Sequence, residues 1–134
     1  MVGAVRAILD TSVVIAAGIG PDIGPLEGEL AISAITVAEL HFGVLVTKQR
    51  KVRSERLRRL LVLQRKFDAL PLDESVAASY GQLAPAVVDA GSQPRARAMD
   101  LLIAATAHAH SARLYTRNVD DFDGLDDLVD VVTV

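Results

Sequence analysis

The stretch that decides the fold is Asp100-Leu101-Leu102-Ile103-Ala104-Ala105-Thr106-Ala107, in which one carboxylate precedes a run of mostly apolar residues. Leu, Ile and Ala without an intervening charge are typical of a helix that is buried on most of its surface. We therefore predict a core helix from Asp100 to about Ser111. A single Asp at such a position is ordinarily an N-cap, because a short carboxylate accepts backbone N–H groups at the positive end of the helix dipole.

Strand and helix patterns alternate along the rest of the chain. Strands are predicted where short apolar runs end in polar turns, over residues 4–9, 30–33, 113–116 and 129–134. Helices are predicted where apolar residues recur at three- and four-residue steps, over residues 13–17, 36–46, 48–67, 73–91 and 100–111. Residues 18–28 are predicted as a loop and residues 70–72 as a break. The alternation favours an α/β fold with a mainly parallel sheet that is covered on both faces.

The length and composition restrict the class of protein. A chain of 134 residues is expected to form one domain, residues 1–134, around a single core. The sequence has no Cys, which excludes disulfides and thiolate metal sites, and we expect a cytoplasmic protein. Residues 1–20 carry Arg6 and Asp10 and lack an apolar run long enough to span a membrane, so no membrane association is expected.

The net charge of −3 conceals an uneven distribution of charges. Nine of the fourteen basic residues lie between Lys48 and Lys66, and six of the seventeen acids lie between Asp120 and Asp130. The basic helix is either a solvated face whose long stems cover apolar neighbours or an electrostatic guide for a nucleic acid. We favour the guide. The candidate phosphate-contacting residues on this helix, and in the loop just before Asp100, are Arg53, Arg56, Arg95 and Arg97.

Several acids stand where the strands of a parallel sheet end or the following helices begin. Asp10 follows the first strand, Glu39 lies in the first turn after the second, Asp100 opens its helix, and residues 118–121 follow the next strand. Each position alone has a structural explanation, for example Glu39 as the partner of Thr36 in a capping box. In an open parallel sheet, however, these are the positions that meet over one crevice.

Converging carboxylates would dictate the chemistry of the site. They repel one another, so they either take up protons or bind a hard divalent cation. Oxygen ligands without Cys favour Mg²⁺ or Mn²⁺, and such an ion supports hydrolysis of a phosphodiester. The histidines are weaker candidates, because His108 and His110 are two residues apart on a helix and point in different directions. A metal-free ribonuclease that uses them as acid and base is therefore disfavoured.

Four short segments occur in one order along the chain, and they are residues 9–12 (LDTS), 33–40 (SAITVAEL), 99–107 (MDLLIAATA) and 116–122 (TRNVDDF). Together they resemble the PIN-domain nucleases, and specifically the VapC toxins of bacterial toxin–antitoxin pairs. The resemblance implies a three-layer α/β/α fold with a central, mainly parallel sheet. It also implies a Mg²⁺- or Mn²⁺-dependent endoribonuclease, a homodimer, an RNA substrate and a VapB-type antitoxin that inserts a segment into the active-site groove.

The resemblance assigns roles to individual positions. It implies metal-binding acids and supporting hydroxyl groups, which are Asp10, Glu39 and Asp100, and Ser12 and Thr116 respectively. The fourth acid is ambiguous, because Asn118 stands where many relatives have Asp and Asp121 lies three residues further on. We predict that Asp121 fills this position with Asn118 assisting. Asp10 and Asp100 would hold the ion, Glu39 would orient or deprotonate the attacking water, and cleavage would leave a 5′-phosphate and a 3′-hydroxyl.

Two other functions remain open from the sequence. A receiver-like phosphoacceptor domain also gathers acids over a parallel sheet, but that family resemblance calls for a Lys near the last strands, and this chain has none after Lys66. A binding domain without hydrolytic activity would use the acidic pocket to recruit a basic peptide. Cleavage of RNA with Mg²⁺, and its loss with a chelator, separates the enzyme from the binder.

Overall fold

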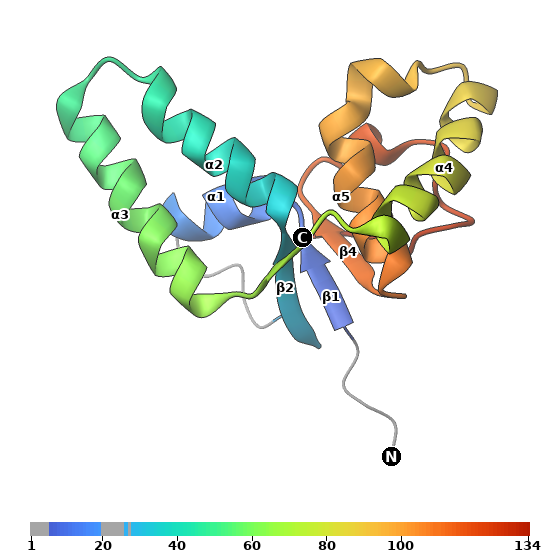
Figure 1. Ribbon diagram of the computed structural model, residues 1–134, viewed down its shortest axis with the longest axis horizontal. Coiled ribbons are helices and arrows are strands. Elements are labelled where there is room, and N and C mark those ends of the chain that lie inside the picture. The colour runs from blue at the N-terminus through green and yellow to red at the C-terminus, as the bar shows by residue number, and fades with distance from the viewer. Residues whose placement is uncertain (1–5, 20–25, 27) are drawn as a thin grey trace.

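The protein has a central sheet flanked by helices (Figure 1). The structure is a computed structural model that describes residues 6–19, 26 and 28–134. The strands are β1 (Arg6–Leu9), β2 (Glu29–Ser33), β3 (Ala69–Leu70), β4 (Arg113–Thr116) and β5 (Val131–Thr133). The helices are α1 (Thr11–Ile19), α2 (Ala34–Val46), α3 (Arg50–Lys66), α4 (Glu74–Asp89) and α5 (Ala98–Ala109), with short 3₁₀ turns η1 (Pro94–Arg97) and η2 (Val119–Phe122).

The sheet has the order β3-β2-β1-β4-β5, and each neighbouring pair of strands is parallel. At its centre, Ile8 of β1 lies beside Ala31 of β2 and Leu114 of β4. The chain leaves β1 for β2 and β3 on one side and later returns to β4 and β5 on the other. The carboxyl ends of β1 and β4 therefore flank the point where the strand order reverses, which is where open α/β sheets bind ligands.

Helices cover both faces of the sheet, as the alternation of side chains along the strands requires. Ala7 and Leu9 of β1 pack with Val13 and Val14 of α1 in one apolar cluster, while Ile8 belongs to the other. Figure 1 shows α1, α2 and α3 on one side of the sheet and α4 and α5 on the other. The three-layer α/β/α fold expected from the sequence is confirmed.

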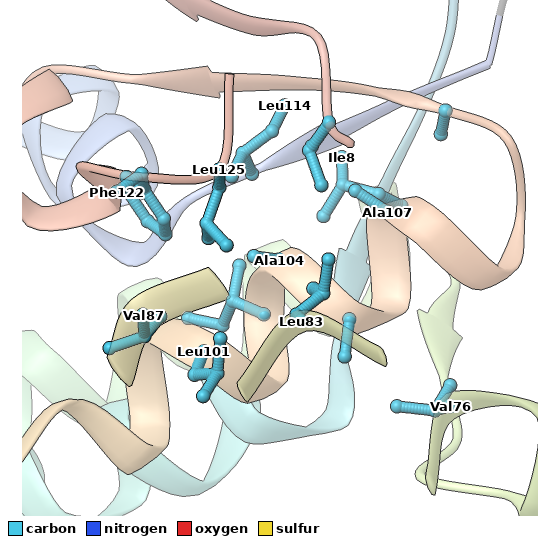
Figure 2. Close-up of a cluster of buried hydrophobic side chains, with 14 residues drawn as sticks. Ile8, Val76, Leu83, Val87, Leu101, Ala104, Ala107, Leu114, Phe122 and Leu125 are labelled. Atoms are coloured by element: carbon cyan, nitrogen blue, oxygen red, sulfur yellow. The ribbon is translucent and has the colours of Figure 1, made fainter. Parts of the chain in front are cut away.

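The larger core cluster lies between the sheet and the α4–α5 pair (Figure 2). Leu101 and Ala104 of α5 are 2% and 0% exposed, and they meet Leu83 of α4 in this cluster. Phe122 and Leu125 close it from the segment after β4. The prediction that the stretch after Asp100 forms a core helix is therefore confirmed. This buried helix carries Asp100 in its first turn.

The first turn of α5 differs from the prediction. The helix begins at Ala98, and Asp100 is its third residue; Arg97 occupies the N-cap position without a side-chain cap hydrogen bond. The alternative explanation of Asp100 as an N-cap does not hold, because the 3₁₀ turn η1 runs directly into α5 and moves the helix start upstream. The Asp100 carboxylate is therefore not used for capping.

Two further local predictions were wrong. The helix predicted from Thr36 begins two residues earlier, because Ser33 at the end of β2 caps it by accepting a hydrogen bond from the backbone N of Ile35 at 3.0 Å. Glu39 is therefore not part of a capping box and lies in the second turn of α2. The strand β3 was missed, because it has two residues and falls at the edge of the predicted break over residues 70–72.

Residues 4 and 5 of the first predicted strand, and residues 20–25 and 27 of the predicted loop, lie outside the described residues. In the part of the chain that the structure describes, no helix combines the length and apolar character that a membrane crossing requires.

Candidate functional site

Asp10 is the most firmly held acid of the site. It follows β1, is 4% exposed, and its backbone N donates to the carbonyl O of Tyr115 at 2.9 Å. Its Oδ2 accepts hydrogen bonds from the hydroxyl groups of Ser12 at 2.7 Å and Thr116 at 2.9 Å. Ser12 and Thr116, which the resemblance assigned to a supporting role, therefore contact the carboxylate directly. They join the carboxyl ends of β1 and β4, where the strand order reverses.

Glu39 faces the same region from α2. It is half-buried, and its Oε1 accepts a hydrogen bond of 2.7 Å from the hydroxyl group of Thr11, the first residue of α1. Thr11 is the immediate neighbour of Asp10, so this hydrogen bond connects α2 to the end of β1. The sequence analysis did not identify Thr11. The only signal available there was its place in the LDTS segment.

The pKa of Asp100 indicates that the four acids lie near one another. The pKa of its half-buried carboxyl is raised from 3.8 to about 6, first by burial and then by the negative charges of Asp121, Asp10 and Glu39, in that order. Arg97 acts in the opposite direction and lowers this pKa. An effect of three other acids on one carboxyl requires that all four lie within electrostatic range, since the influence of a charge fades with distance. The sequence prediction had assigned these same four acids to one site.

The segment after β4 contributes the fourth acid. The backbone N of Asn118 donates to the Thr116 hydroxyl at 3.0 Å, and the backbone N of Asp121 donates to the carbonyl O of Asn118 at 3.0 Å. The turn η2 thus continues from the same threonine that holds Asp10. Among the neighbouring charges, Asp121 has the largest effect on the pKa of Asp100. This favours Asp121 as the fourth acid, with the Asn118 backbone supporting its position.

The acids fit a divalent cation in donor type and charge. Carboxylate oxygens are the hard ligands that Mg²⁺ and Mn²⁺ prefer, and a cation relieves the repulsion that raises the pKa of Asp100. Over residues 6–19, 26 and 28–134, no three acidic or histidine side chains form a ready-made metal-binding group. The carboxylates therefore lie within electrostatic range of one another and not in a preformed coordination shell.

The four arginines predicted to contact phosphate have different surroundings. Arg95 is exposed in η1, while Arg97 donates to the backbone carbonyl of Asp120 at 3.1 Å and so connects η1 with η2. Arg53 and Arg56 of α3 donate to the carbonyl oxygens of Thr47 and Gly43 at 2.8 Å and 2.6 Å, at the carboxyl end of α2. These last two satisfy carbonyl groups that a helix end leaves without partners.

A groove of about 420 Å³ runs between α1, α2 and α3 and reaches Glu39. Apolar side chains such as Leu40 and Leu60 line it, and Arg56 and Arg59 border it. The family resemblance implied a groove at the active site, but the residues that line this groove were not predicted, because the lining depends on how the α2–α3 pair packs against α1.

His108 is engaged with α4. His108 pairs through Nδ1 with the hydroxyl group of Ser79 at 2.8 Å, which joins α5 to α4.

Comparisons with known proteins agree with this geometry. Residues 7–128 match the family model described as PIN domain. Ribonuclease VapC8 of Mycobacterium tuberculosis is 38% identical over 100 residues, which cover 75% of this chain and 88% of that protein. The crystal structure of VapBC-5 from M. tuberculosis, described as a member of the VapBC family of toxin–antitoxin systems, has a TM-score of 0.78 at 29% identity and covers 97% of this chain and 98% of its own. The crystal structure of FitAcB from Neisseria gonorrhoeae has a TM-score of 0.75 at 33% identity, and the match covers 93% of this chain and 95% of the FitAcB chain. The chain therefore belongs to the PIN-domain family, as a relative of the VapC ribonucleases.

Proposed function

We propose that this protein is a divalent-metal-dependent endoribonuclease, folded as one PIN domain over residues 1–134, and the toxin of a type II toxin–antitoxin pair. The observation that carries the proposal is the electrostatic convergence of four acids on Asp100. Relatives that are named ribonucleases and a relative named Toxin FitB support the reaction and the toxin role. The cytoplasmic location predicted from the sequence is part of the same proposal.

The contacts of each acid indicate its role in metal binding or in activation of the water molecule. Asp10, fixed by Ser12 and Thr116, and Asp100, at the start of the buried α5, would hold a Mg²⁺ or Mn²⁺ ion, with Asp121 and Glu39 completing the set. When bound, such an ion stabilises negative charge on the phosphodiester and lowers the pKa of a water molecule.

Glu39 orients the attacking water and accepts its proton. The water oxygen then forms a bond to phosphorus, the bond from phosphorus to the 3′ oxygen breaks, and that oxygen takes up a proton. The products are a 5′-phosphate and a 3′-hydroxyl. Because in-line attack needs the water on the side of the phosphorus opposite the leaving oxygen, the orientation of Glu39 affects the rate directly.

Positive charge near the acids guides the RNA. Arg97 is the last residue of η1, its side chain donates to Asp120 of η2, and its charge acts on Asp100; Arg95 is exposed in the same turn. We infer that both contact phosphates next to the cleaved bond, Arg97 through the guanidinium N–H groups that its hydrogen bond to Asp120 leaves over. Arg53 and Arg56 each use one guanidinium nitrogen on a carbonyl at the end of α2, and their positive charge attracts the RNA from α3.

A VapB-type antitoxin and a second copy of the chain are the proposed protein partners. Solved structural relatives include VapBC-5 and FitAcB, and a groove of about 420 Å³ leads to Glu39. Phe42 and Leu45 on α2 are 69% and 68% exposed, which is typical of a surface that another polypeptide covers.

The test is cleavage of a structured RNA by the purified protein with Mg²⁺ or Mn²⁺, before and after addition of a chelator. Cleavage is expected only with the metal, and Asp100→Asn is expected to abolish it. Asp89→Asn is the matched control, because Asp89 is an exposed acid in the last turn of α4. RNA binding without cleavage under every metal condition would contradict the proposal and favour a binding domain.

A further inference from the structure

Two threonine hydroxyl groups lie in series behind Glu39. The Thr11 hydroxyl donates to Glu39 Oε1 at 2.7 Å, and the hydroxyl groups of Thr11 and Thr36 lie 2.9 Å apart. Thr11 begins α1, while Thr36 and Glu39 are three residues apart on α2 and share one face of that helix. The three groups therefore form one continuous contact between the two helices.

Proton counting gives this contact a single direction. A hydroxyl group has one proton to donate and two lone pairs that accept. Thr11 uses its proton on Glu39, so it must be the acceptor in its contact with Thr36. Thr36 therefore donates to Thr11, and Thr11 donates to Glu39. Hydrogen bonds in such a series polarise and strengthen one another.

Burial keeps this arrangement in place. Thr36 is 0% exposed, so water does not compete for its proton, and a buried hydroxyl without a partner would cost free energy. Because Thr11 has no second proton, its hydrogen bond to Glu39 goes to Oε1 alone. The rotation of the carboxylate is thereby restricted to the orientations that keep Oε1 on Thr11.

We propose that Thr11 is a positioning residue for Glu39 and that Thr36 is the buried donor that fixes the direction of the Thr11 hydroxyl. The proposal rests on the function proposed above, in which Glu39 orients the attacking water. It predicts that the two threonines affect metal affinity and turnover through Glu39, without contact with the RNA.

The experiment compares Thr11→Val, Thr11→Ser and Thr36→Val with the wild-type protein. Valine keeps the shape of threonine and removes the hydroxyl group, whereas serine keeps the hydroxyl group. We expect Thr11→Val to lower kcat by about tenfold or more, with KM for RNA nearly unchanged, because supporting contacts of metal-site residues have effects of this size. Thr36→Val should give a smaller loss in the same direction, and Thr11→Ser should restore most of kcat.

The matched control is Ser79→Ala, which removes another buried hydroxyl group. Ser79 is 4% exposed, lies on α4 and pairs with Nδ1 of His108 on α5 at 2.8 Å, so it touches neither α1 nor α2 through this contact. Its kcat and metal affinity are expected to equal those of the wild type. A loss in Ser79→Ala as large as that in Thr11→Val would show a general effect of core packing and overturn the positioning role.

A second readout does not depend on RNA cleavage. Calorimetric titration with Mn²⁺ alone should give weaker binding for Thr11→Val, and a double variant Thr11→Val/Glu39→Gln should bind no more weakly than Glu39→Gln alone. Additive losses in this cycle would refute action through Glu39. If Thr11→Val keeps wild-type kcat and Mn²⁺ affinity while Asp100→Asn is inactive, the positioning role fails and the ribonuclease proposal stands. If the wild type cleaves no RNA but the Mn²⁺ cycle behaves as expected, the ribonuclease proposal fails and the positioning role stands.

Discussion

Replacement of Asp100 by Asn is expected to stabilise the metal-free protein while it abolishes the proposed activity. Burial and three neighbouring acids raise the pKa of Asp100 from 3.8 to about 6, so its charged form is unfavourable in the folded state. This rise in the pKa of Asp100, by roughly 2, corresponds to about 3 kcal/mol of free energy disfavouring the charged carboxylate in the folded state. Because the side chain is half-exposed, solvent screening reduces the expected gain in the free energy of unfolding to about 1 kcal/mol.

The pH dependence fixes the sign of this effect. The folded state binds the Asp100 proton more tightly than the unfolded chain does, so the wild type loses stability as the pH rises from about 4 to about 6. Asn does not titrate. The advantage of Asp100→Asn should therefore be small near pH 4, grow through this range and be complete above pH 6.

The assay is thermal unfolding of the wild type and Asp100→Asn in the presence of a chelator, near pH 4 and near pH 7.5. A gain of about 1 kcal/mol raises Tm by roughly 3 to 4 °C for a chain of this size. Excess Mg²⁺ should stabilise the wild type and have little effect on the variant, because a ligand of the folded state raises its stability. Destabilisation of the chelated variant near pH 7.5, or an equal gain at both pH values, would refute the electrostatic explanation.

Three further predictions follow from individual contacts. Thr116→Val removes one of the hydrogen bonds to the buried Asp10 carboxylate and should lower the free energy of unfolding by about 1.5 to 3 kcal/mol in urea titrations; an unchanged midpoint would contradict this. Leu101→Ala should cost about 3 kcal/mol in the same assay, because it leaves a cavity between α4 and α5, and a loss below 1 kcal/mol would argue against that packing. Arg97→Ala removes the charge that lowers the pKa of Asp100, so the acidic limb of the pH–rate profile should move to higher pH; a shift to lower pH would be inconsistent with the site electrostatics.

The sequence predicted the elements whose signal is local. The uncharged apolar run after Asp100 requires a buried environment, and it forms the core helix α5. The positions of Asp10 and Asp121 were predictable for a similar reason, since each follows a strand that periodicity identifies. A parallel arrangement then brings the carboxyl ends of β1 and β4 together without further information.

Helix starts and the short strand were harder to predict, because several local signals compete there. Ser33 and Thr36 are both good N-caps, and Ser33 takes the role because it follows β2 directly. At Asp100 the preceding 3₁₀ turn η1 extends the helix upstream, so an ideal cap residue lies inside the first turn. Two residues, Ala69 and Leu70, carry too little pattern to indicate β3, which exists because it pairs with the edge of β2.

Contacts between helices could not be predicted, because they depend on tertiary packing. The hydrogen bond from Thr11 to Glu39 joins residues 28 positions apart and exists only where α1 and α2 meet. The same holds for the position of Arg97 over η2, which the sequence suggested as a phosphate contact and the structure places against a backbone carbonyl.

The three best-placed acids differ in how their charge is compensated, and this difference indicates what each one does. Asp10 accepts hydrogen bonds from two hydroxyl groups and Glu39 accepts one, so neighbouring side chains hold both carboxylates in place. The pKa of Asp100 is set by burial and by neighbouring charges, which raise it to about 6. Asp100 therefore gains most from a bound cation, and it should be the acid whose replacement most clearly separates stability from activity. Asp10→Asn should lower both the stability and the activity of the protein, because the hydroxyl groups of Ser12 and Thr116 then lose their charged acceptor.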